Sequence, residues 1–541
     1  MDRRTEEDHT RDPVLIVLRE AMPGSGHVPS PSELSVEVQN QRQVASRDLG
    51  MLALLALALV LLHTLTNGLY PFYRDELATL DDARHLAWGY VVYPPMTPFL
   101  GRLALELFGA SPTGLRLFSA LAQALVLLLT GLTAREIGGR RPAQLVAAFA
   151  AAIAPPALFT GGFVSYTSFD YLWWITVAYF VVRLLRSDDP RWWVAIGAAI
   201  GAGMMTKYTM IYLVAGVVAG VLLTPARRYL RSPWLWCGAV IAALVWSPNL
   251  VWLIQHHFVS LDYLKSIHAR DVRWGRADYF LLNQFWRCTN VVTVPLWGAG
   301  FWYLFATRDG KRYRPLGWMY VVPLVAFLAS RAREYYLAPA YPMLLAAGAV
   351  WGERWTRTLS ARAAATVRGT AWQSIAVSGL LTAAVILPLA PVGSGWWRLA
   401  DSINGNFGYS VGYREMVETV ARIRDSLPAA QRPRIGVLAG DDGEAGAVDL
   451  YGPAYGLPRA IGGMNTYWFR GYGDPPPETV IVVGMSRSFV DRSFASCEVA
   501  GRLANRYGVV NHAIAGYEDV FVCRQLRQSW PEFWKHFQYY G

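Results

Sequence analysis

The sequence predicts a polytopic α-helical membrane protein with a small α/β domain at its C-terminal end. Of the 541 residues, 53% are hydrophobic and 16% are charged, whereas a soluble protein carries about 25% charged residues. The hydrophobic residues gather in blocks of roughly 16 to 22 residues, the length that crosses a bilayer as a helix. Arginine-rich segments follow every second block, as expected of cytoplasmic loops. The last 150 or so residues lack such blocks.

Residues 1–49 are polar, and we expect them to form a largely disordered cytoplasmic tail. This tail is too long to be the charged region of a cleavable signal peptide, so the first hydrophobic block should remain as a membrane helix. The chain 50–391 then forms the membrane domain, with about eleven spans. The expected spans are 50–69, 113–133, 143–160, 167–185, 192–206, 208–224, 233–254, 287–306, 315–330, 337–353 and 372–390.

Charge orients these spans with the N-terminus in the cytoplasm. The inner loops then hold basic clusters at 135–141, 183–191, 227–231, 308–314 and 354–368, as the positive-inside rule requires. An odd number of spans leaves residues 392–541 outside. The net charge of +11 is therefore a topology signal, and we expect no nucleic-acid partner. The predicted location is a bacterial plasma (inner) membrane.

Two outer loops are long. Residues 70–112 contain two helical stretches separated by Pro94-Pro95; they are too short and too charged to span, so they should lie along the interface. Residues 255–286 form the second loop. Its adjacent His256 and His257 cannot share a helix face, and with nearby acids they form only a weak divalent-cation pattern, so we expect no metal. Two short spans, 192–206 and 315–330, predict a cavity that opens toward the outer leaflet.

The C-terminal region has the pattern of an α/β domain. Short apolar runs ending in glycine at 434–440 and 479–484 predict buried strands, and 413–426 predicts a helix. Cys497 and Cys523 both lie in this domain. Because the domain is expected outside the cytoplasm, we predict a disulfide between them.

Three acidic residues are candidates for catalysis. Asp75 and Glu76 directly follow the first span, where a carboxylate can take a proton from an acceptor hydroxyl; an ordinary acidic cap on an interfacial helix is the alternative. Asp170 lies at the outer start of the fourth span. Ionisable groups in membrane segments usually face a cavity, although a boundary aspartate in water remains an alternative.

Three cations break the positive-inside pattern, because they lie at outer span ends. Lys207 separates two apolar blocks, and Arg331 and Arg333 end the ninth span. A lipid phosphate would explain them, since arginine binds phosphate bidentately and lysine binds it as a point charge. Snorkelling toward headgroups is the alternative.

Several motifs resemble one family. The Tyr73–Glu76 sequence Tyr-Arg-Asp-Glu after the first span resembles the membrane glycosyltransferases of the GT-C fold, within them the bacterial branch of the protein-mannosyltransferase and aminoarabinose-transferase group (glycosyltransferase family 39). Further similar stretches are 85–90 with 94–95, 205–208, 247–257, 334–342 and 443–452. The resemblance covers residue 50 to the end.

This resemblance implies a GT-C fold and a polyprenyl-phosphate sugar as donor, with no other cofactor. It implies that Asp75 is the base, with Glu76 beside it, and that Asp170 is a second acid. Lys207, Arg331 and Arg333 match phosphate-binding positions. We also expect five side chains to line the substrate cavity, namely Tyr73, Arg74, His85, Tyr335 and Tyr336.

The predicted function is transfer of a sugar from a polyprenyl-phosphate donor to an acceptor hydroxyl at the outer face of the membrane. The acceptor, a glycan, lipid or protein, stays open, as does the sugar. Alternatives are a transferase of larger glycans, a lipid-linked-glycan flippase and a catalytically silent assembly partner. Transporters usually show repeated halves, and this sequence shows none.

Overall fold

The computed structural model of the chain describes residues 31–511 and 514–541, with side chains from residue 46 onward. The chain divides into two units, residues 1–54 and 55–541. Helix α2 runs from Pro31 to Thr66, although the sequence analysis predicted a disordered tail up to residue 49. Between Pro31 and Gly50 there is no proline or glycine, and proline is favoured in the first helical turn. The rest of the predicted tail lies outside the described residues.

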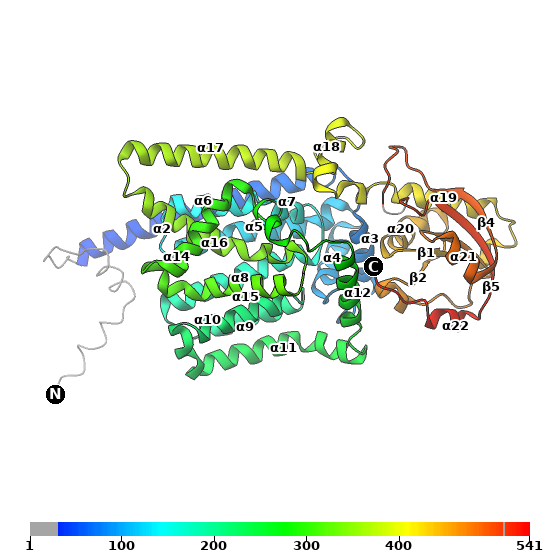
Figure 1. Cartoon of the computed structure of the whole chain (residues 1–541), viewed down its shortest axis with the longest axis horizontal. Coiled ribbons are helices and arrows are strands. Elements are labelled where there is room, and N and C mark those ends of the chain that lie inside the picture. The colour runs from blue at the N-terminus through cyan, green and yellow to red at the C-terminus, as the bar shows by residue number, and fades with distance from the viewer. Residues whose placement is uncertain (1–30, 512–513) are drawn as a thin grey trace. The chain divides into compact units, whose positions relative to one another are not determined.

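The unit 55–541 begins with a mainly helical region (Figure 1). Its further helices are α3 (Arg74–Arg84), α4 (Met96–Phe108), α5 (Pro112–Glu136), α6 (Arg141–Ala152), α7 (Pro155–Gly161), α8 (Tyr166–Ser187), α9 (Trp192–Met204), α10 (Met210–Leu222), α11 (Pro233–Gln255), α12 (Val259–Arg273), α13 (Phe280–Trp286), α14 (Val294–Ala306), α15 (Arg314–Ala329), α16 (Tyr341–Thr356), α17 (Ala361–Ile386) and α18 (Gly395–Asn404). Helix α9 packs against α8 and α11, and α10 packs against α15.

All eleven predicted span ranges contain helix, but not all of these helices are long enough to span. Within the described part of the chain, five helices are long and apolar enough to cross a membrane, and two bent pairs raise the number to seven. The remaining four ranges hold α9, α14, α15 and α16, of 13 to 16 residues. At 1.5 Å per residue they reach only about 20–24 Å, so the count of eleven spans is not confirmed.

Two of the long helices expose most of their apolar surface. In α11 and α17, 22% and 11% of the most apolar segment is buried. A soluble protein rarely leaves contiguous apolar surface of this extent in water. The exposed faces are those expected to contact lipid, and the chain is a multi-pass membrane protein.

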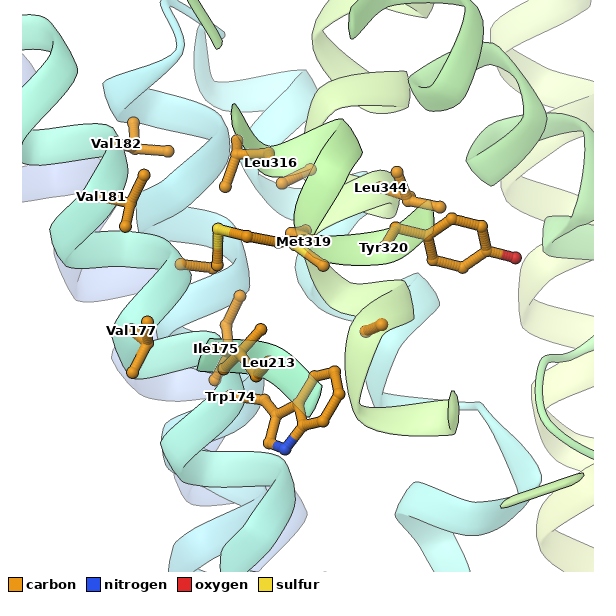
Figure 2. Close-up of a cluster of buried hydrophobic side chains, with 14 of the residues drawn as sticks. Trp174, Ile175, Val177, Val181, Val182, Leu213, Leu316, Met319, Tyr320 and Leu344 are labelled. Carbon is orange, nitrogen blue, oxygen red and sulfur yellow. The ribbon is translucent and has the colours of Figure 1, made fainter. Parts of the chain in front are cut away.

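The core of the helical region is a cluster of large apolar side chains from α8, α10, α15 and α16 (Figure 2). On α8, Trp174, Val177 and Val181 recur at intervals of three and four residues, so they share one face of the helix. Met319 of α15 lies among them in the figure. This packing fixes α8, which carries Asp170.

The first outer loop contains the two short helices that the sequence predicted. Helices α3 and α4 flank Pro94-Pro95, and each is too short to cross the membrane. Helix α3 buries Leu77 and Leu80 and also the acidic side chains of Glu76, Asp81 and Asp82.

The C-terminal part is an α/β domain built on a five-stranded sheet with the order β2-β1-β3-β5-β4. The strands are β1 (Ile435–Ala439), β2 (Ala460–Gly462), β3 (Thr479–Val483), β4 (Phe494–Arg502) and β5 (Asp519–Leu526), and the helices are α19 (Tyr413–Ser426), α20 (Asp442–Tyr451), α21 (Arg487–Ser493) and α22 (Trp530–Lys535). Strands β1, β2 and β3 are parallel, and β5 is antiparallel to both β3 and β4. The predicted strands and the predicted helix correspond to β1, β3 and α19.

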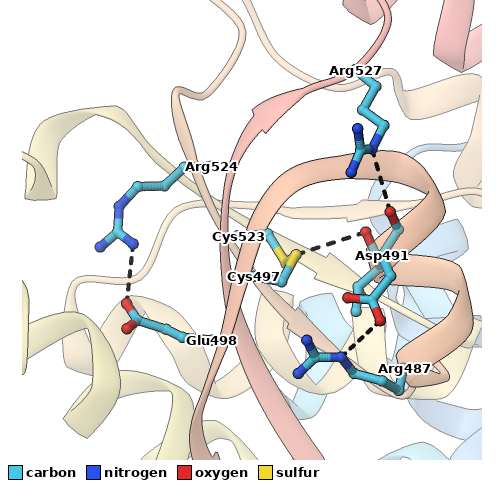
Figure 3. The surroundings of a disulfide bond; sticks show 8 residues. Arg487, Asp491, Cys497, Glu498, Cys523, Arg524 and Arg527 are labelled. Carbon is cyan, nitrogen blue, oxygen red and sulfur yellow. Dashed lines mark hydrogen bonds and ion pairs between the residues drawn. A yellow bond between two sulfur atoms is a disulfide. The ribbon is translucent and has the colours of Figure 1, made fainter.

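The predicted disulfide between Cys497 and Cys523 is present. The two cysteines face each other in the pairing of β4 with β5. Surface ion pairs surround the disulfide, including Arg524 with Glu498 at 3.0 Å and Arg487 with Asp491 at 2.9 Å (Figure 3). The disulfide therefore fixes the outermost strand to its neighbour.

The C-terminal domain packs on the first outer loop through α20 and α3. A Cβ atom added at Gly446 would overlap the carbonyl of Leu77 and lie 2.9 Å from the nitrogen of Ala78. Ion pairs border this contact: Arg470 binds Asp81 and Asp82, each at 3.0 Å, and Arg459 lies 3.4 Å from Asp81. The domain is thus held against the residues that follow the first span.

Substituting Gly446 by alanine should loosen this contact, because the added methyl group must displace the backbone of α3. We expect a loss of about 1–3 kcal/mol of stability, measured as a lower thermal unfolding temperature of the purified protein. Gly369→Ala is the matched control, since an added Cβ there meets nothing within 4 Å. Equal unfolding temperatures for the two variants would contradict the close packing described here.

Candidate active site

Glu76 is the anchor of the first outer loop. Its carboxylate accepts hydrogen bonds from Arg116 (Nη2–Oε2, 2.7 Å), from the backbone N–H of Tyr73 and from that of Val164, both at 2.8 Å. The Glu76 side chain is fully buried and that of Arg116 is nearly so. A carboxylate with all these partners has no free position for a substrate proton. Glu76 therefore positions the loop, although the sequence analysis placed it among the catalytic residues.

Asp75 lies next to this anchor and has the opposite surroundings. Its side chain is 53% exposed, and among the residues that the structure describes its one ion-pair partner is Arg74, Nε to Oδ1 at 3.0 Å. The backbone of α3 is fixed by Glu76, so the exposed carboxylate of Asp75 stands at a defined position. An exposed carboxylate in a fixed place is suited to accept a proton.

Lys207 and Asp170 form a buried ion pair, with 3.5 Å between Nζ and Oδ2. The same Asp170 oxygen accepts a hydrogen bond from Thr209 at 2.9 Å. Nζ of Lys207 is buried without a hydrogen-bond partner among the described residues. Instead it faces the rings of Tyr336, Tyr166 and Tyr335, at 4.5, 5.2 and 5.3 Å from their centroids. A lysine held in this way retains donors for an anion.

Arg333 is held in place by the buried carboxylate of Asp271. Its Nη2 lies 3.1 Å from Oδ1, and its Nε contacts the other carboxylate oxygen. Arg276 and Arg270 also lie within 3.5 Å of Asp271, so three guanidinium groups share one carboxylate and the cluster carries net positive charge. Arg331 stands apart: it is about half exposed and pairs with Asp278 at 3.0 Å.

Tyr335 connects the two cationic centres. Its hydroxyl accepts a hydrogen bond from Arg333 at 3.4 Å, and its ring lies over Lys207. Burial would raise the pKa of Tyr335, but the positive charges of Arg333 and Lys207 outweigh it and hold the pKa below its ordinary value. The surroundings of this phenol thus favour a negatively charged group, and the same surroundings would favour a bound phosphate.

Tyr263 of α12 connects the cationic centres with Asp75. Burial raises the pKa of Tyr263; the charge of Arg333 opposes this, and those of Asp442 and Asp75 add to it. The charges of Arg333, Asp442 and Asp75 thus all act on Tyr263, although the four residues come from separate parts of the chain. Sequence reasoning found neither Tyr263 nor Asp442. Asp442 had a signal, since it follows a predicted strand that ends in glycine, where α/β sheets bind ligands.

The remaining predicted residues lie around Asp75. The Tyr73 ring contacts Phe163 and Tyr409, with centroids 5.1 and 5.6 Å apart, and Arg74 lies over the same Tyr409 ring. His85 instead pairs with Asp81 at 3.2 Å. It belongs to the contact between α3 and the C-terminal domain.

The His and Asp residues of 255–286 that formed a weak divalent-cation pattern do not form a cluster in the structure. His256 stacks on Trp252, Asp262 pairs with Lys265, and Asp271 is taken up by arginines. In the segments 31–511 and 514–541, no group of three or more His, Cys, Asp or Glu side chains could hold a metal ion.

The chain is similar in sequence to several known proteins. The family model described as dolichyl-phosphate-mannose-protein mannosyltransferase matches residues 92–252. Lipid A galacturonosyltransferase RgtD of Rhizobium johnstonii is 28% identical over 303 residues, which are 53% of this chain and 61% of that protein. Undecaprenyl phosphate-alpha-4-amino-4-deoxy-L-arabinose arabinosyl transferase of Pseudomonas aeruginosa is 27% identical over 237 residues, 41% of this chain and 36% of that protein. The chain thus matches less than two thirds of the length of either relative.

The fold matches a solved structure over most of its length. ArnT from Cupriavidus metallidurans superposes with a TM-score of 0.55 in its complex with undecaprenyl phosphate and 0.56 in the apo state, at 16% identity. The match covers 87% of this chain and 97% of ArnT. The protein therefore has the GT-C fold, as the sequence analysis predicted. Within that class, its matches fall in the protein-mannosyltransferase and ArnT group, which confirms the resemblance.

The buried pair of Glu76 and Arg116 generates a prediction about stability. Glu76→Gln leaves the Arg116 charge buried and unpaired, which should cost about 3–5 kcal/mol. Asp75→Asn removes only an exposed ion pair and should change stability by less than about 1 kcal/mol. Thermal unfolding of the two purified variants tests this difference. A larger loss for Asp75→Asn would contradict the division between anchor and exposed acid.

Proposed function

We propose that this protein is a glycosyltransferase that transfers a sugar from a polyprenyl-phosphate donor to an acceptor hydroxyl. The observation that carries the proposal is the buried Lys207 amine, which has tyrosine rings around it and no hydrogen-bond partner among the described residues. Besides its ion pair with Asp170, a buried ammonium group without a hydrogen-bond acceptor can take a further anion, and a lipid phosphate at the outer span ends is a suitable one. The name of the Pseudomonas arabinosyl transferase and the undecaprenyl phosphate bound in the ArnT complex agree with such a donor.

The proposed reaction divides the work between the exposed acid and the cations. The acceptor oxygen attacks the anomeric carbon while Asp75 takes its proton, and the bond from that carbon to the phosphate oxygen breaks. Polyprenyl phosphate leaves with the electron pair, and Lys207 and Arg333 stabilise its charge. Because the leaving phosphate needs little protonation, one base is sufficient, in contrast to the paired acids of glycosidases.

The other predicted residues take supporting roles in this scheme. Asp170 orients Lys207 through their ion pair, and Asp271 orients Arg333. Tyr335 and Tyr336 form the wall beside the phosphate. Arg331 is exposed and paired with Asp278, so we assign it a weaker contact with lipid headgroups. We expect the reaction to need no metal ion.

Substitution of Asp75 and Lys207 should separate chemistry from binding. Asp75→Asn keeps the shape and removes the basicity, so turnover should fall by about 10²-fold or more with donor binding nearly intact. Lys207→Ala removes a charge-assisted contact and should weaken donor binding by about 10-fold or more. Both values are measured on protein reconstituted in membranes with synthetic polyprenyl-phosphate sugars.

Asp278→Asn is the matched control, because Asp278 is an exposed, paired carboxylate beside Arg331 and should leave both values unchanged. Near-normal turnover of Asp75→Asn, with turnover abolished in a correctly folded Asp170→Asn variant, would assign the base to Asp170 instead.

We further propose that the N-terminus lies in the cytoplasm and the C-terminal domain on the outer side of the membrane. The alternation of basic loops supports this orientation, as does the disulfide, because such bonds persist in oxidising compartments. Alkaline phosphatase, which folds only outside the cytoplasm, should be active when fused after Gly541 and inactive when fused after Arg231. The reverse pattern would overturn the orientation and with it the location of the active site.

A further inference from the structure

The C-terminal domain presents two polar side chains at the carboxyl ends of neighbouring parallel strands. Asp442 follows β1 and opens α20, and Asn465 follows β2. Asn465 Nδ2 donates a hydrogen bond of 2.7 Å to Oδ2 of Asp442. The carboxyl ends of parallel strands are the usual ligand-binding edge of α/β sheets.

Asn465 shows that this pair is incomplete as it stands. Its side chain is buried with 3% of its surface exposed, and Oδ1 has no hydrogen-bond partner in the part of the chain that the structure describes. Its backbone has φ of 51° and is held by a hydrogen bond from its N–H to the carbonyl of Tyr539 at 3.0 Å. A buried amide oxygen without a partner is costly unless another molecule supplies a donor.

Asp442 lies near the proposed base, because the next residue, Gly443, packs closely on Arg74, which pairs with Asp75. Burial raises the pKa of Asp442 to about 6; Arg74 opposes the shift, and the negative charges of Asp441 and Asp75 add to it. Asp442 and Asp75 also both act on Tyr263. The C-terminal domain thus brings a carboxylate to the place where the proposed reaction occurs, and α20 is held there by the close contact of Gly443 with Arg74.

We propose that Asp442 and Asn465 bind hydroxyl groups of a sugar at the active site. This inference rests on the proposed function and deepens it. The Asp442 carboxylate and the free oxygen of Asn465 are both acceptors, so they select O–H or N–H donors. The acids Asp441, Asp442 and Asp75 together disfavour a carboxylate on the same ligand. The subsite therefore suits a neutral or amino sugar better than a uronic acid.

Two sugars meet at such a site, the one on the donor and one on the acceptor, and binding measurements separate them. The probes for the donor are undecaprenyl phosphate and undecaprenyl-phosphate mannose, each titrated into the full-length protein in lipid nanodiscs. The probe for the acceptor is the envelope glycolipid fraction of a strain that lacks this protein, used to saturate transfer.

The test variants are Asp442→Asn and Asn465→Gly. Glycine is chosen at position 465 because it tolerates the positive φ of that residue. If the pair binds the donor sugar, both variants should bind undecaprenyl-phosphate mannose about 10-fold more weakly and undecaprenyl phosphate as the wild type does. If it binds an acceptor sugar, the affinities stay unchanged and the half-saturating amount of acceptor rises about 10-fold. Either result supports the subsite.

Asp449→Asn is the matched control, because Asp449 lies on the same helix but accepts hydrogen bonds from within the domain, from the Ala460 N–H at 2.7 Å and the Tyr467 hydroxyl at 3.3 Å. It should affect thermal unfolding and none of these values. Wild-type affinities and acceptor saturation in both test variants would overturn the proposal, as would equal weakening for both lipids. Failure of the wild-type protein to bind either lipid would overturn the proposed function itself.

Discussion

The arrangement of residues 67–76 and of α3 depends on one buried arginine. Besides Glu76, Arg116 contacts the carbonyl oxygens of Asn67, Tyr70 and Pro71, so a single guanidinium group of α5 gathers the turn that connects α2 to α3. A planar group with five donors can hold several acceptors at once, and lysine could not replace it. Asp75 owes its position to this turn, and so does the surface of α3 on which the C-terminal domain packs. The exposed acid is thus supported by a charge that never meets solvent.

Charge compensation explains the rest of the site. Each cation near the membrane has an acid that holds it, Lys207 with Asp170 and Arg333 with Asp271. The pairing reduces the cost of burying charge, while the surplus of arginines around Asp271 leaves the region positive. Tyrosine rings surround the Lys207 amine without neutralising it. In the proposed donor site, a phosphate would thus meet positive charge although each buried cation there has an acid beside it.

More of the fold than of the site could be predicted from the sequence. Hydrophobic block length and alternating basic loops identified the helices, and the Pro94-Pro95 pair separated α3 from α4. The number of spans did not follow, because the short helices α9, α14, α15 and α16 are stabilised by packing against neighbours and not by their own length. Helix α2 begins earlier than predicted, because the polar segment after Pro31 contains no proline or glycine that would end a helix.

Position along the chain made Asp75, Asp170, Lys207 and Arg333 candidates for the site, since each lies near the end of a predicted span. It could not separate Glu76 from Asp75, because the partner of Glu76 is forty residues away on α5. Tyr263 lies on α12 in a stretch of sequence without a motif, and only folding brings it near the other groups. Which of two adjacent acids is free depends on tertiary partners that are distant in the sequence, so sequence reasoning could not decide it.

The contact between α3 and α20 has a consequence for how such proteins are recombined. The backbone of α3 leaves no space for a side chain at Gly446, and arginines of the C-terminal domain bind the acids of α3. Residues 70–112 and 392–541 are therefore coupled by this contact, even though nearly three hundred residues of membrane domain separate them in the sequence. A chimera that exchanges the C-terminal domain between relatives must exchange the first outer loop with it, or the two halves of the new protein will not fit.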